Sequence, residues 1–123
     1  GDPLLIMAAS RGKLLELLAR KMKPGQAQFA DEAFMTGMLS LVDVALGQSK
    51  DEILGPLPIA ASVKEALLEK KGQLAQLLSL ADAAEQSDFI TMEAKLASLP
   101  NLTLPILANC QVEAMDWANL LTA

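Results

Sequence analysis

The sequence of 123 residues has no histidine and no tyrosine, so chemistry by this chain would rest chiefly on carboxylates, hydroxyls and one thiol. Histidine is the commonest general base, the commonest metal ligand and the usual partner of a nucleophilic serine or cysteine. Neither common spacing of a glycine-rich phosphate loop occurs. We therefore predict no catalytic residue, no cofactor-binding residue and no metal ligand, so we expect a protein that is not an enzyme.

Ser40 and Asp43 are the polar residues that stand out in the apolar stretch from residue 37 to residue 43. In a structural interpretation, Ser40 bonds back to a backbone carbonyl and Asp43 meets a cation such as Arg11. In a functional interpretation, the two residues are the remnant of an active site. The residue types alone leave this choice open.

Other carboxylates come in close pairs. Asp82 and Glu85 could share one face of a helix, and a magnesium or calcium site there is the alternative to a solvated face. No further ligand lies near them in the sequence. The remaining pairs stand at expected helix starts, where negative charge complements the helix dipole. They are Asp31 with Glu32 and Asp51 with Glu52.

The single cysteine and the single tryptophan fall on the apolar stripe expected for the last helix. Cys110 cannot form an internal disulfide, and we interpret it as a buried, inert thiol rather than a reactive one. Trp117 is interpreted as a core anchor, with an interface anchor as the alternative. The whole stripe comprises Leu107, Cys110, Ala114, Trp117 and Leu121.

The spacing of apolar residues predicts an all-α fold, a compact bundle of six to seven short helices that forms a single domain over residues 1–123. Aromatic residues are only 3% of the chain, so Leu, Ala, Ile, Val and Met must build the core. Gly37 and Ser40 are small enough to let another backbone approach closely. Helices are expected over residues 3–21, 31–46, 62–70 and 73–86. A short helix is expected to end near residue 54, another to end near residue 99, and a last one follows. The expected N-caps are Asp2, Ser49, Ser62, Ser87 and Thr103.

Charge and hydropathy argue against two classes of partner. The formal net charge is −5, and the basic residues at positions 13–23 and 64–71 are interleaved with glutamates, so we expect no nucleic-acid binding. The apolar stretch at residues 4–9 is far too short to span a bilayer, so we expect no membrane partner. Without a signal-peptide pattern, and with Gly1 interpreted as a residue left by expression, we expect a cytoplasmic protein.

The segment around Ser40 also resembles a known family. Residues 34–43 have the sequence FMTGMLSLVD, followed by Glu52-Ile-Leu and Leu57-Pro58. This order resembles the C-terminal half of the HDOD (HD-related output) domain of bacterial signalling proteins. It is most similar to the subgroup in which HDOD follows an EAL domain, the fold of cyclic-di-GMP phosphodiesterases. Further matches extend to residue 121 and include Arg11, Glu16, Leu18, Ala19, Val63, Ala66, Leu67, Gly72, Leu78, Glu85, Phe89, Glu113, Ala114, Trp117 and Ala118.

The resemblance implies that a metal-binding dyad has been lost. In many HDOD sequences the matching helix is Gly-Leu-Leu-His-Asp-Ile-Gly, and the related HD phosphohydrolases hold metal with the His-Asp pair. Laid on that pattern, His falls on Ser40, Asp on Leu41 and the final Gly on Asp43. Serine and leucine cannot coordinate a divalent metal as that pair does. A whole HDOD domain is longer and its first half has no counterpart here, so we expect either a truncated domain or a naturally short protein.

From the resemblance we expect a non-catalytic regulatory module that acts through contacts with another protein domain, such as an EAL domain. The faces that would have packed on the missing half, chiefly the first helix, are expected to pair with a second copy. Leu5 and Leu17 are the candidate contact residues of this homodimer. The alternative is a residual metal-dependent phosphohydrolase or nucleotide-binding protein that uses carboxylates, and a third interpretation is a helical adaptor unrelated to HDOD.

Overall fold

The computed structural model describes residues 2–121, and all the regular secondary structure in this part of the chain is helical. The predicted all-α class is therefore confirmed. One expected helix is divided into α2 and α3, and a short π-helical turn, η1, follows α5. The elements are α1 (Pro3–Met22), α2 (Ala27–Leu39), α3 (Val42–Leu46), α4 (Lys50–Leu54), α5 (Ala61–Lys64), η1 (Glu65–Glu69), α6 (Gln73–Glu85), α7 (Phe89–Ser98) and α8 (Leu104–Leu120).

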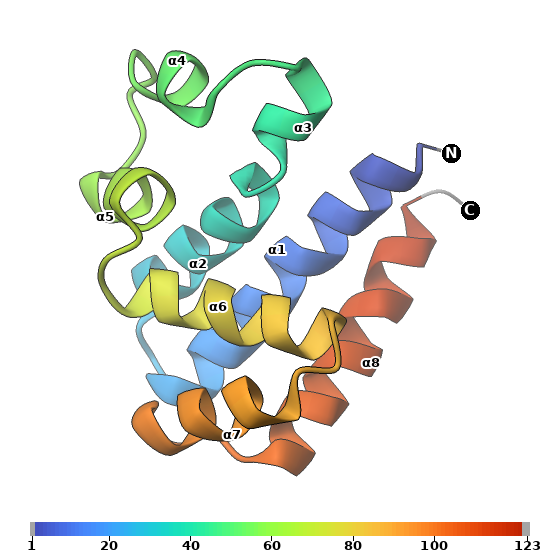
Figure 1. Ribbon diagram of the computed structural model, residues 1–123. Coiled ribbons are helices and arrows are strands. Elements are labelled where there is room, and N and C mark those ends of the chain that lie inside the picture. The colour runs from blue at the N-terminus through green and yellow to red at the C-terminus, as the bar shows by residue number, and fades with distance from the viewer. Residues whose placement is uncertain (1, 122–123) are drawn as a thin grey trace.

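Helix α1 is the central element of the bundle. It lies between α2 and α8, and α8 runs antiparallel to it, so that the start of α1 lies beside the end of α8 (Figure 1). Helix α6 crosses α1 and α2, α7 lies against α6, and α3 and α4 form a separate end of the molecule (Figure 1). The core between these helices is aliphatic, as the composition requires. Its fully buried leucines include Leu15, Leu18, Leu54, Leu77, Leu80 and Leu107.

Helices α1 and α2 touch through their backbones at two glycines. A Cβ atom built on Gly37 would lie 2.6 Å from both the Arg11 carbonyl oxygen and the Gly12 Cα. A Cβ atom on Gly12 would lie 2.9 Å from the Phe34 carbonyl oxygen. Cβ atoms in proteins essentially never come this close to other heavy atoms, so only glycine permits this helix crossing. The expected close approach at Gly37 is confirmed, and its partner is Gly12.

The helix predicted for residues 31–46 is wrong in its bounds. Helix α2 already begins at Ala27 and ends at Leu39, and α3 begins only at Val42. At the break, the Ser40 hydroxyl donates a hydrogen bond to the Gly37 carbonyl over 2.7 Å. A serine that bonds back to its own helix competes with the backbone ladder and favours a bend. The expected back-bond of Ser40 is thus confirmed, and it lies at the end of the helix.

Three of the five predicted N-caps are confirmed. The side chains of Asp2, Ser49 and Thr103 accept hydrogen bonds from backbone N–H groups of the first turns of α1, α4 and α8. Ser62 is not a cap, because α5 begins one residue earlier and the Ser62 hydroxyl donates to Glu32. Ser87 is not a cap either. Its neighbour Asp88 caps α7 by accepting from Thr91 N–H.

The apolar stripe of α8 differs from the prediction at its C-terminal end. Cys110 is buried as expected, and desolvation by burial raises the pKa of its thiol. Trp117 is half-buried, with its ring edge against Phe34 and the Lys13 ammonium 5.1 Å from its centre. Leu121 is exposed, and Ala118 takes the buried position instead. Among residues 2–121, none of the helices combines the length and the hydropathy that crossing a bilayer requires.

The close contact at Gly37 predicts that an alanine there lowers the stability of the fold, although helix propensity alone predicts the opposite. Gly37→Ala is expected to lower the free energy of unfolding by about 1 to 3 kcal/mol, because the new methyl group meets backbone atoms that cannot move aside. Helix propensity alone would raise it by about 1 kcal/mol. Urea unfolding measures the difference, and Ala94→Gly on the exposed face of α7 reports the propensity effect alone. A Gly37→Ala variant as stable as the wild type would contradict the steric account.

Candidate functional site at the break between α2 and α3

Arg11 joins three helices beside the position where the resemblance placed the lost histidine. Its guanidinium donates through Nη1 to the Ser40 Oγ over 3.0 Å. It also binds Glu85 of α6 with two hydrogen bonds, from Nε over 3.1 Å and from Nη2 over 2.6 Å. This two-point geometry is the strongest form of an arginine–carboxylate pair. The Arg11 side chain is only 10% exposed, so α1, α2 and α6 meet around a nearly buried cation.

Asp82 is the second carboxylate that faces Arg11. Its Oδ1 lies 3.5 Å from the Arg11 Nη2, one helical turn before Glu85. The expectation that Asp82 and Glu85 share a helix face is confirmed by their common contact with Arg11. Their partner is this arginine, whereas the alternative had been a magnesium or calcium ion. Within residues 2–121 there is no group of three His, Cys, Asp or Glu side chains that could hold a metal ion.

Asp43 meets a cation, as the structural interpretation expected, but the cation is Lys50 and not Arg11. Its carboxylate pairs with the Lys50 ammonium of α4 at 3.5 Å, a distance that gives an ion pair without a hydrogen bond. The Asp43 Oδ1 is buried and has no hydrogen-bond donor. This contact holds α3 and α4 together across the turn at Gly47, whose backbone is left-handed with φ 67°. The back-folding of α3 and α4 explains why the charge nearest to Asp43 comes from Lys50.

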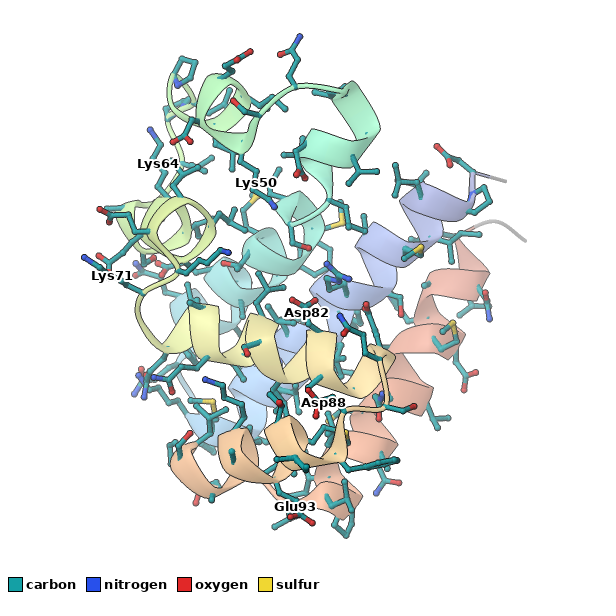
Figure 2. The ribbon with its side chains drawn as sticks, viewed as in Figure 1. Lys50, Lys64, Lys71, Asp82, Asp88 and Glu93 are labelled. Carbon is teal, nitrogen blue, oxygen red and sulfur yellow. The ribbon has the colours of Figure 1, made fainter. Side chains whose placement is uncertain are left out.

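Lys50 also links this pair to the Arg11 group electrostatically. Figure 2 shows Lys50 reaching from α4 toward the side of α6 on which Asp82 lies. Desolvation by burial raises the pKa of Asp82 above its ordinary value of 3.8. The positive charges of Arg11 and Lys50 lower this pKa, the negative charge of Glu85 raises it, and the net shift is upward. Two cations and three carboxylates therefore form one charged cluster at the junction of five helices.

The raised pKa of Asp82 has a definite sign for stability. A carboxyl group whose pKa is higher in the folded state binds a proton more readily there than in the unfolded chain. The stabilisation from protonating Asp82 is thus present below pH 3.8 and is lost as the pH rises through its folded pKa. At neutral pH, Asp82 is a half-buried charge that depends on Arg11 and Lys50.

The remaining residues predicted from the sequence, Leu41, Leu5 and Leu17, do not lie together in one site. Leu41 is half-buried at the break and supplies no polar atom to the cluster. Leu5 is 56% exposed near the start of α1, whereas Leu17 packs against the core. Twelve helical residues separate the two by about 18 Å, so they do not form one contact patch. Sequence reasoning missed Lys50, whose only signal was its position just after the glycine turn that follows Asp43.

Comparisons with known proteins connect the chain to one protein of cyclic di-GMP signalling and to one uncharacterized protein. No protein-family model matches it, and no solved structure matches it significantly. It is 33% identical over 88 residues to the cyclic di-GMP phosphodiesterase CdgJ of Vibrio cholerae serotype O1, an alignment that covers 72% of this chain and 20% of that protein. It is 34% identical over 116 residues to the uncharacterized protein YuxH of Bacillus subtilis, covering 92% of this chain and 26% of that protein. The chain thus spans a fifth to a quarter of the length of these relatives.

Removing the arginine tests whether the cluster holds the helices together. Arg11→Gln is expected to lower the free energy of unfolding by about 1 to 3 kcal/mol, because Glu85 and Asp82 lose their counter-charge and Ser40 loses a donor. Arg20→Gln is the matched control. Arg20 is 52% exposed and pairs with Glu16 on the same helix, so its loss should cost about 0.5 kcal/mol or less. Equal losses in the two variants, measured by urea unfolding, would remove the argument for a structural cluster.

Proposed function

We propose that the chain is the C-terminal half of an HDOD-like domain that regulates a bacterial signalling protein through contacts and without catalysis. Two observations support the family. The residue order around Ser40 resembles the HDOD subgroup that follows EAL domains, and the chain is similar to part of a cyclic di-GMP phosphodiesterase. The similarity covers only a fifth of that relative, which suits a module attached to other domains.

The contact between Arg11 and Ser40 is the observation that carries the non-catalytic proposal. The position where HD relatives place their metal-binding histidine holds a serine whose hydroxyl is bonded to a guanidinium at 3.0 Å. That guanidinium is held in place by Glu85. A divalent metal at this point would face a fixed positive charge at contact distance, a repulsion on the order of several kcal/mol. Arg11 therefore supplies the positive charge that a metal ion supplies in the hydrolases of the family.

The cluster also suggests how a contact could be transmitted. It joins α1, α2 and α6 through Arg11 and joins α3 to α4 through Asp43 and Lys50. A partner domain that binds one arrangement of these helices more tightly than another shifts the population between them. Regulation then requires no bond-making chemistry in this chain.

The function is tested by an exchange with the Vibrio relative. Deleting the segment of CdgJ that aligns with this chain is expected to change its rate of cyclic di-GMP hydrolysis, and inserting this chain there is expected to restore it. The chain alone, with Mn²⁺ or Mg²⁺, is expected to hydrolyse nothing. Hydrolysis by the chain alone that disappears in Asp43→Asn would contradict the proposal, as would an insertion that behaves like the deletion.

The second part of the proposal is self-association at the exposed end of α1. Leu5 and Met7 of α1 and Met115 and Leu121 near the end of α8 are exposed, and these two helix ends lie side by side (Figure 1). Exposed apolar side chains that gather at one end favour a protein contact. A symmetric dimer would bury this end of one copy against the same end of another.

Leu5→Glu is expected to convert a dimer to a monomer in sedimentation velocity without lowering the melting temperature, because Leu5 is already exposed. The matched control is Ile90→Glu, which places the same charge on an 84% exposed residue of α7. Leu17→Glu is not a usable probe, since Leu17 packs against the core and its substitution should unfold the chain. A wild-type monomer at high concentration would overturn the dimer.

A further inference from the structure

A hollow of about 340 Å³ lies on the outer face of α6, against η1 and α7. Both of these elements contact α6. The volume falls within the range of pockets that hold small molecules. Apolar side chains line part of it, namely Ala66, Ala75 and Leu78, and polar side chains line the rest, namely Lys70, Gln76, Ser79, Asp82 and Lys95.

Two lysines from different elements line this hollow, and neither forms an ion pair among the described residues. Lys70 ends the π-helical turn η1 and Lys95 comes from α7. Within residues 2–121, neither ammonium has an acidic partner within ion-pair distance, unlike Lys13 and Lys50. Lys70 also has a left-handed backbone with φ 57°, a conformation that costs energy for a residue with a side chain. An uncompensated pair of cations beside a concave surface attracts an anion.

The polar groups in the rest of the hollow define the remainder of the ligand. The side chains of Gln76 and Ser79 have no hydrogen-bond partner among the described residues, so both are available to a bound molecule. Asp82 contributes a carboxylate, which accepts hydrogen bonds and repels anions. A ligand that fits the hollow therefore carries its negative charge beside Lys70 and Lys95 and an N–H or O–H donor beside Asp82.

We propose that this hollow binds a small anion, a phosphate or carboxylate that also carries a hydrogen-bond donor, with Lys70 and Lys95 holding the anionic group and Asp82 accepting from the donor. Asp82 is also the contact of Arg11 at 3.5 Å, so the ligand touches the charged cluster directly. The inference rests on the proposed function in one respect, because the ligand would be the signal that the regulatory module senses.

Binding is measured on the chain itself by amide NMR titration with two probes. The nucleotide 5′-GMP carries a phosphate and an amino donor, and L-glutamate carries carboxylates and an ammonium. Saturable shifts confined to residues around the hollow are expected with at least one probe, and the probe that binds identifies the anion. Lys95→Gln is expected to weaken binding about ten-fold, which corresponds to one lost charged contact.

The matched control is Lys71→Gln, which removes the same charge from the neighbour of Lys70 that lines a different surface hollow. It should change the affinity less than two-fold. No saturable shift with either probe would overturn the proposal, and so would equal weakening by Lys71→Gln and Lys95→Gln, which would indicate nonspecific attraction. A change in the Arg11 Nε–H signal on binding tests the link to the cluster. Because binding is measured without any partner domain, its failure is distinct from a failure of the exchange experiment with CdgJ.

Discussion

The backbone contact between Gly12 and Gly37 is the constraint on which the rest of the molecule depends. It brings α1 and α2 so close that a Cβ on Gly37 would lie 2.6 Å from main-chain atoms of α1. Arg11 precedes one of these glycines, and Ser40 follows the other by about one helical turn. The crossing therefore places the guanidinium against the serine hydroxyl before any charge interaction is considered. The charged cluster is a consequence of the helix packing, and it then adds to the stability of that packing.

A nearly buried arginine needs strong compensation, and the end of α6 provides it. Glu85 accepts two hydrogen bonds from the guanidinium, and Asp82, one helical turn before Glu85, lies within ion-pair distance of it. The Ser40 hydroxyl accepts a third hydrogen bond, from Nη1. Such a group is costly to separate, because Arg11, only 10% exposed, would be left as an unpaired charge in a poorly solvated place. In the proposed function this arrangement replaces a catalytic metal with a structural cation. In that proposal the same helices remain joined, and the chain regulates without hydrolysis.

Asp82 occupies the boundary between that cluster and the hollow on the outer face of α6. One side of its carboxylate faces Arg11, and the same residue lines the hollow with Lys70 and Lys95. A molecule bound in the hollow would change the environment of a charge that already carries a raised pKa. This position gives a physical route from a surface ligand to the junction of α1, α2 and α6, with no need for a long chain of intermediate contacts.

The sequence by itself determined the helical class and most helix boundaries. These properties depend on local signals, such as helix caps at Asp2, Ser49 and Thr103. Only the tertiary structure decided which charges meet. The sequence could not indicate that Arg11 selects Glu85, 74 positions away, or that Asp43 pairs with Lys50. Nor could it show that Leu17 packs against the core while Leu5 stays exposed, because a helix that is apolar on two sides shows its buried face only after its neighbours have packed.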